Sequence, residues 1–386
     1  MEFSLARRTL SNLVLGVGFG LTGAGTVMLG VLLPEFSKQF GLRDDTAGLL
    51  FLLQFLGASS GAVIIGANHV RWLAIGYGLL AVSACALAFS GLPLVFPVFY
   101  FFGLGLGITM TATSLVFSDR YREDCAAKLQ RLNFAWAIGA TTAPVLFLPY
   151  LRMAALSPLF LTLVGLFLAL LVWVLLRERQ AAPVSQPAAH DTLSQSQGPQ
   201  VSLVLLVVLA TCAVGVEASI SGWLTTYSKR AGETHSVGTV LAISLFWIGM
   251  TLSRFLFSTR LLAIVGTRRT MRMALWCLAA SVATLIAAHT PATIQVCAML
   301  AGLSLGPLYP LALSFMLEIT GQGWIFAVGG VGAATFPWFA GLISAHFGSL
   351  HYGVVVPCVA ALLMLMLASI GLRDVKLSTP PLISLR

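Results

Sequence analysis

The chain alternates between long apolar stretches and short polar connections. Thr9–Pro34, Thr46–Asn68, Leu132–Leu151 and Met153–Leu176 contain no Asp, Glu, Lys or Arg, and each is long enough to cross a bilayer as a helix of about 20 residues. Longer uncharged stretches break at short turns and therefore predict pairs of helices. The pattern predicts helices at 9–36, 45–67, 72–90, 93–118, 127–150, 157–176, 201–228, 236–262, 271–288, 292–317, 322–346 and 351–371. The predicted fold class is an all-α membrane protein with twelve transmembrane helices.

One long connection divides these helices into two sets of six. Residues 177–200 are rich in Gln, Ser, Pro and Ala and poor in large apolar side chains, a composition typical of a flexible linker. The other predicted connections are short. We therefore expect an N-terminal bundle at 1–176, a cytoplasmic linker at 177–200 and a C-terminal bundle at 201–386.

Two short phrases recur half a chain length apart. Gly139–Pro144 (GATTAP) returns as Gly332–Pro337 (GAATFP), and Gly103–Gly107 (GLGLG) returns as Gly302–Gly306 (GLSLG). Two matches in the same order indicate that the halves are related repeats. Membrane transporters are often built this way, with a substrate site between the repeats near the bilayer midplane. The repeat therefore predicts two pseudo-symmetric six-helix bundles and a transport function.

Charge is scarce and unevenly distributed. Charged residues make up 9% of the chain, against about 25% in a soluble domain. The net charge of +9 raises nucleic acid as a partner, but most basic residues fall in the connections on one side of the predicted bundle. That asymmetry follows the positive-inside rule and predicts both termini in the cytoplasm. We expect an inner or plasma membrane location, lipid around the helices and no nucleic-acid partner.

Common enzyme and cofactor motifs are missing from the sequence. There is no Gly-x4-Gly-Lys-Ser/Thr nucleotide loop, no His-Glu-x-x-His motif and no Cys-x-x-Cys motif. The cysteines lack metal-ligand spacing, so neither a metal site nor a disulfide framework is expected. We predict that the protein is not an enzyme and uses no cofactor beyond a coupling ion, a proton in the first place or sodium.

Glu217 is the most informative single residue. It lies near the middle of the predicted helix 201–228. An ionised carboxylate at that depth costs about 2.5 kcal/mol or more, so such residues usually face a cavity and mark ion or substrate routes. The alternative is a hydrogen-bonded acid that joins two helices. Glu217 is predicted to bind the coupling ion and to contact the substrate.

Arg254 is the one basic residue deep in a predicted span. By helical rise it lies roughly 10 Å closer to the cytoplasm than Glu217, which argues against direct pairing. An inner-gate contact with Asp119 or Glu318, near the inner ends of two other helices, is an alternative to a substrate role. Arg254, Asp119 and Glu318 are therefore predicted as gating residues.

Polar and aromatic side chains cluster on helices that are expected to line a cavity. Amides beside flat aromatic faces suit sugars, which present hydroxyl groups on one side and C–H groups on another. For the deepest aromatic residues, cavity lining and plain packing both remain open. With Glu217, the predicted substrate-binding residues are Gln54, Asn133, Trp136, Trp223, Tyr227, Trp247, Tyr309 and Trp338.

Three phrases carry a resemblance to a known family. Gly215–Tyr227 with its Gly-x-Glu-x5-Trp pattern, Gly302–Pro310 with Gly-Pro-x-x-Pro, and Gly330–Trp338 resemble the fucose/galactose/glucose–proton symporter branch of the major facilitator superfamily. The resemblance covers nearly the whole chain and implies alternating access, proton coupling, a small solute that is often a sugar, and a monomer. The superfamily's loop signature is only partly kept, as Asn68–Arg71 and Gly266–Arg269.

We predict a secondary active transporter that moves a small polar solute, a sugar in the first place, by ion-coupled symport. Proton-driven efflux, or transport of a lipid or other amphiphile, is the first alternative, and a roomy apolar cavity would favour it. A membrane receptor that does not transport is the second alternative, and measurable solute flux would exclude it.

Overall fold

The computed structural model of the chain describes residues 2–121, 125–153, 156–177, 202–233, 236–258, 264–319 and 328–371. Throughout these ranges the regular elements are helices, and eleven of the helical segments are long and apolar enough to cross a membrane. The remaining predicted span is α10 (Thr267–Ile286), whose first two turns carry Arg268, Arg269 and Arg272 and therefore lower its mean hydropathy. The predicted all-helical membrane fold is confirmed.

The chain divides into two compact units. The first comprises Met1–Leu42 and Leu49–Ala188, and the second comprises Arg43–Gly48 and Ala189–Arg386. The first unit contains α1 (Glu2–Phe40), most of α2 (Asp44–Val63), α3 (His69–Phe89), α4 (Val95–Arg120), α5 (Cys125–Arg152) and α6 (Leu156–Arg177). The second contains α7 (Leu203–Ala231), α8 (Ser236–Ser258), α10, α11 (Pro291–Leu305), α12 (Leu308–Ile319), α13 (Val328–Phe347), α14 (Leu350–Gly353) and α15 (Val355–Gly371). The predicted linker at 177–200 begins with Arg177, which is the last residue of α6, and its other residues lie outside the described ranges.

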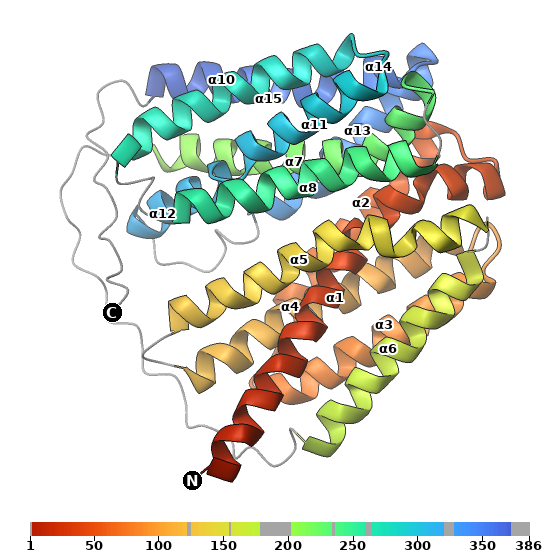
Figure 1. Cartoon of the computed structure of the whole chain (residues 1–386), viewed down its shortest axis with the longest axis vertical. Helices are drawn as coiled ribbons and strands as arrows, with labels where there is room; N and C mark the ends of the chain where they lie inside the picture. The colour runs from red at the N-terminus through yellow and green to blue at the C-terminus, as the bar shows by residue number, and fades with distance from the viewer. Residues whose placement is uncertain are drawn as a thin grey trace. The chain divides into compact units, whose positions relative to one another are not determined.

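The helices of each unit pack in the same pattern. In the first unit α1 packs on α5, and α3 packs on both α4 and α6 (Figure 1). In the second unit α7 packs on α13, and α10 packs on both α11 and α15 (Figure 1). Taken in chain order, these are the same pairs of helices, so each half of the sequence builds the same arrangement.

The repeated phrases supply equivalent helix crossings in the two units. A Cβ atom on Gly139 of α5 would lie 1.8 Å from the Gly20 carbonyl oxygen of α1, and one on Gly332 of α13 would lie 2.0 Å from the Thr211 carbonyl oxygen of α7. No side chain fits at such a distance. The backbones touch directly, as small residues permit at helix interfaces in membranes. The recurrence in the sequence therefore reflects a recurrent packing need.

The second repeated phrase does the same for another pair of helices. A Cβ atom on Gly103 of α4 would lie 1.9 Å from the Gln54 carbonyl oxygen of α2, and one on Gly302 of α11 would lie 2.0 Å from the Phe246 carbonyl oxygen of α8. These four contacts fix which residues of one unit correspond to which residues of the other.

One predicted helix is interrupted. The span predicted at 292–317 is built from α11 and α12, which separate at Gly306-Pro307. Proline lacks the N–H that a helix interior requires and its ring crowds the preceding turn, so a break at this position follows from the sequence. The break places Tyr309 on the first turn of α12.

Candidate functional site: an acid–base pair in the second unit

The centre of the candidate site is an ion pair between α7 and α8. Arg254 Nη2 lies 3.5 Å from Glu217 Oε2, and the two side chains are 28% and 16% exposed. Both residues lie within helices long and apolar enough to span a membrane. Two opposite charges in such surroundings stabilise each other, because either charge alone would be strongly disfavoured there.

The pairing corrects the sequence-based expectation that Glu217 and Arg254 lie too far apart in depth. The rise per residue locates Cα atoms, whereas helical side chains lean toward the N-terminus of their own helix. Consecutive spanning helices run in opposite directions. The Glu217 side chain on α7 and the Arg254 side chain on α8 therefore lean toward each other, and the long arginine side chain closes the remaining distance.

Further polar groups surround the pair. Tyr309 on α12 lies within electrostatic reach of both Glu217 and Arg254. Arg254 Nε is buried and has no hydrogen-bond partner among the described residues. The Ser253 hydroxyl, also buried, has none within the same ranges. The site thus combines one acid, one base, one phenol and hydrogen-bond donors that have no acceptor among the described residues.

The positions of the first unit that correspond to the charged pair hold uncharged residues. Gly103 contacts Gln54 in the first unit, and Gly302 contacts Phe246 in the second, so Gln54 and Phe246 occupy equivalent positions. The same number of residues further along each helix, Ala62 of α2 is equivalent to Arg254 of α8. Gly139 contacts Gly20 of α1, and Gly332 contacts Thr211 of α7, so these two positions are also equivalent. Further along the two helices, Thr26 of α1 is therefore equivalent to Glu217 of α7. Ionic chemistry at this depth is therefore concentrated in the second unit.

In the first unit, the predicted substrate-binding residues lie in different environments. Gln54 is 1% exposed, and its Nε2 donates to the Thr26 carbonyl oxygen at 3.0 Å, which ties α2 to α1. Asn133 is exposed on α5, and Trp136, one turn further along the same helix, is partly exposed. Asn133 and Trp136 therefore remain accessible candidates, whereas Gln54 serves helix packing in this conformation.

In the second unit, two of the predicted aromatic residues are packed into the bundle. Trp223 is 3% exposed, and its Nε1 donates to the Pro337 carbonyl oxygen at 2.8 Å. Trp247 is 2% exposed and lies edge-on to Phe246. Tyr309 and Trp338 are partly exposed. For Trp223 and Trp247 the structure supplies a packing role, and a substrate role stays a prediction.

Tyr227 caps a helix. Its hydroxyl group donates to the Leu285 carbonyl oxygen and lies 3.3 Å from that of Ala288, while His351 Nδ1 donates to the Ile286 carbonyl oxygen at 2.7 Å. The last carbonyl groups of a helix have no partner within the helix. Tyr227 of α7 and His351 of α14 therefore satisfy the C-terminal end of α10.

Replacing Tyr227 with Phe should remove this cap. Because the freed carbonyl groups are buried, we expect a loss of about 1–3 kcal/mol of stability, seen as a lower unfolding temperature in detergent. The control is Tyr100→Phe, since the Tyr100 hydroxyl makes one long contact of 3.3 Å with Ser60. An unchanged unfolding temperature together with a higher KM for transport would instead support the substrate role predicted for Tyr227 from the sequence.

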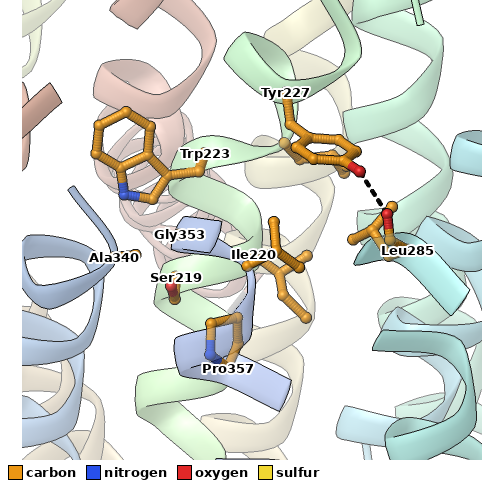
Figure 2. Close-up of a pocket in the computed structure, with 10 residues that line it drawn as sticks. Ser219, Ile220, Trp223, Tyr227, Leu285, Ala340, Gly353 and Pro357 are labelled. Atoms are coloured by element: carbon orange, nitrogen blue, oxygen red, sulfur yellow. Dashed lines mark hydrogen bonds between the residues drawn. The ribbon is translucent and has the colours of Figure 1, made fainter. Parts of the chain in front are cut away.

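The cavity drawn in Figure 2 is separate from the acid–base pair. Its lining includes Ser219, Ile220, Trp223, Tyr227 and Pro357, and Glu217 is not part of it (Figure 2). Its walls are mainly apolar side chains of α7, with single residues from α10, α13, α14 and α15. We interpret it as a packing gap inside the second unit.

Comparisons with known proteins identify the family. Residues 15–322 match the model of the Major Facilitator Superfamily. The chain belongs to this superfamily. A stretch of 145 residues is 24% identical to the sodium-dependent glucose transporter 1 of Rattus norvegicus, covering 36% of this chain and 30% of that protein. The chain thus matches less than a third of the length of this curated relative.

Solved transporter structures share the fold. A POT family transporter in complex with 5-aminolevulinic acid superimposes with a TM-score of 0.77 at 14% identity, covering 95% of this chain and 96% of that one. A mutant form of the nucleoside transporter NupG superimposes with a TM-score of 0.68 at 13% identity, covering 94% and 99%. The match to the superfamily model and the eleven candidate spans among the described residues make the protein a multi-span membrane protein of a transporter family.

The structure gives partners for two of the three residues predicted to form the gate. Arg254 pairs with Glu217. Asp119, at the end of α4, instead pairs with His69 Nδ1 at 2.7 Å, at the start of α3. The Glu318 side chain lies outside the described part of the chain. His69 belongs to the partly kept loop signature, which was the available sequence signal for this contact. A gating role for these residues stays a prediction.

A second polar cluster was missed from sequence. Arg230 on α7 donates two hydrogen bonds to Asp44, from Nη1 at 2.8 Å and from Nη2 at 2.9 Å. Ser344 on α13 also donates to the Asp44 carboxylate. Asp44 begins α2, and residues 43–48 belong to the second unit while the rest of α2 belongs to the first. The cluster therefore anchors the first turn of α2 to the second unit.

Replacing Asp44 with Asn should loosen this anchor. Loss of the carboxylate charge removes the paired contact with Arg230, so we expect backbone amides at 43–48 to exchange hydrogen about tenfold faster. Hydrogen exchange followed by mass spectrometry measures this directly. The matched control is Asp45→Asn, because the ion pair of Asp45 is with the exposed Arg43, at 3.2 Å. Equal exchange in both variants would contradict the anchoring role.

The described residues contain no group of three or more His, Cys, Asp and Glu side chains placed to hold a metal ion.

Proposed function

We propose that this superfamily member takes up a small polar solute of the sugar class by alternating access, driven by protons that bind Glu217. The observation that carries the proposal is the Glu217–Arg254 pair at 3.5 Å within two spanning helices. A buried carboxylate that exchanges a proton changes the charge of the site. A change in charge alters the relative stability of the conformations that hold it.

The sugar class is supported by two observations. One is the similarity to the rat glucose transporter over part of the chain. The other is the presence of Asn133 and Trp136 as accessible amide and aromatic groups on α5. The same relative is named as sodium-dependent, which favours sodium as the second candidate for the coupling ion. By the positive-inside rule we place the protein in an inner or plasma membrane with both termini in the cytoplasm.

Uptake into proteoliposomes tests the proposal. A panel of labelled sugars and sugar derivatives is offered with an inward proton gradient, with an inward sodium gradient, or with neither. Accumulation that requires the proton gradient supports the proposal. Accumulation that requires the sodium gradient would make sodium the coupling ion instead of the proton. Absence of flux under every gradient would reject sugar uptake and favour efflux or amphiphile transport.

A further inference from the structure

We propose that the solute carries one negative charge, as a sugar acid does, and that Arg254 binds its carboxylate once Glu217 is protonated. This inference rests on the proposed function and deepens it. In the empty, deprotonated site Glu217 serves as the counter-ion of Arg254. In the loaded site a proton neutralises Glu217, and the substrate carboxylate takes over as the counter-ion.

The geometry of the pair leaves Arg254 available for a second partner. Its 3.5 Å separation from Glu217 is longer than the roughly 2.7–2.9 Å of a charge-assisted hydrogen bond. Arg254 Nε is buried without a partner among the described residues, although a guanidinium group offers five N–H donors in a planar fork that matches a carboxylate. Arg254 is also the more exposed member of the pair, at 28% against 16%.

Few other charges face Glu217. Among the helices packed against α7, α8 contributes Arg254 and α12 contributes the phenol of Tyr309. α7 itself also carries Cys212, Tyr227, Lys229 and Arg230, of which Arg230 pairs with Asp44. The other elements packed against α7 carry Cys297, His346, His351, Tyr352 and Cys358, of which His351 lies beside Tyr227. The Glu318 side chain of α12 lies outside the described residues. The charge of the site is therefore set by Glu217, Arg254 and whatever binds them.

Charge balance then couples the proton to the anion. The empty deprotonated pair is neutral, and the pair loaded with one proton and one monoanion is also neutral. A proton alone leaves a net positive site, and an anion alone leaves a net negative one. Net charge is strongly disfavoured in a membrane interior, so the two neutral states are the ones that can reorient. The predicted stoichiometry is one proton per monoanion, and the transport cycle is electroneutral.

The experiment compares labelled D-glucuronate with labelled D-glucose in proteoliposomes under an inward proton gradient, with and without a potassium diffusion potential set by valinomycin. We expect uptake of glucuronate that the potential does not change, and at least about tenfold less uptake of glucose. Proton-driven glucose uptake that an inside-negative potential accelerates would overturn the inference while leaving the proposed function intact. Absence of proton-driven uptake of either solute would reject the proposed function itself.

Binding to variants tests the same inference independently of transport. Glu217→Gln mimics the protonated acid, so we expect it to bind glucuronate with an affinity that no longer falls as the pH rises. Arg254→Gln should lose glucuronate binding at least about tenfold, and Arg254→Lys should recover part of it, because lysine keeps the charge without the fork. The control is Glu233→Gln, which changes an exposed acid after the end of α7. Glucuronate binding that Arg254→Gln leaves unchanged would overturn the inference.

Discussion

A Glu217→Gln variant is expected to lose proton-driven accumulation while still exchanging solute across the membrane. Glutamine keeps the shape of the side chain but cannot bind or release a proton. At one proton per solute, a gradient of one pH unit supplies about 1.4 kcal/mol, enough for about tenfold accumulation. We expect this ratio to fall to about one in the variant, measured as the ratio of internal to external label at steady state.

Measuring solute exchange shows whether the variant has lost proton coupling alone or has lost its folded, active state. Counterflow of labelled against unlabelled solute needs no net proton movement, so it should persist in Glu217→Gln. The matched control, Glu233→Gln, should accumulate solute as the wild type does, because Glu233 is exposed beyond the end of α7. Full accumulation by Glu217→Gln would remove Glu217 from the coupling mechanism.

Gly332→Ala is expected to destabilise the second unit severely. The added Cβ would lie 2.0 Å from the Thr211 carbonyl oxygen and 3.0 Å from the Gly215 backbone nitrogen. Both are backbone atoms that cannot move aside as a flexible side chain can. Overpacking of a core costs about 1–3 kcal/mol, and we expect the upper end of this range or more, seen as a lower unfolding temperature and a smaller monodisperse fraction.

The internal repeat supplies a second test, and α6 supplies a control. Gly139→Ala should destabilise the first unit to a similar extent, since its Cβ would lie 1.8 Å from the Gly20 carbonyl oxygen. A Cβ on Gly165 of α6 would have no neighbouring atom within 4 Å, so Gly165→Ala should gain up to about 1 kcal/mol from helix propensity. A stable Gly332→Ala variant would contradict the direct backbone contact between α7 and α13.

Much of the fold could be predicted from the sequence, because a bilayer imposes simple rules on it. Stretches without charge had to be spanning helices, and the recurring phrases marked close crossings that each half needs. The break between α11 and α12 at Gly306-Pro307 was not predicted, because the uncharged stretch at 292–317 is continuous, although a proline cannot supply the N–H of a helix interior. Among the described spans, α10 departs from the plain hydropathy pattern, because three arginines occupy its first two turns.

The site was harder to predict because it depends on side-chain direction and tertiary contacts. Glu217 could be singled out from the sequence because an ionised carboxylate near the middle of a membrane span is energetically costly. The pairing of Glu217 with Arg254 could not be predicted, because the rise per residue takes no account of the direction in which side chains point on antiparallel helices. The Asp44–Arg230–Ser344 cluster joins positions far apart in the chain, and no local pattern links them. The hydrogen bonds of Tyr227 and Trp223 to backbone carbonyl groups have no signature in the sequence, so their packing roles could not be predicted.

Proton movement during uptake tests the central claim most directly. Proteoliposomes loaded with a pH-sensitive dye receive glucuronate from outside at equal pH on both sides. Our account predicts that the interior of wild-type vesicles acidifies as solute enters, and that Glu217→Gln vesicles show no acidification while they still exchange label. Solute entry into wild-type vesicles without any change in internal pH would contradict the proton-coupled mechanism.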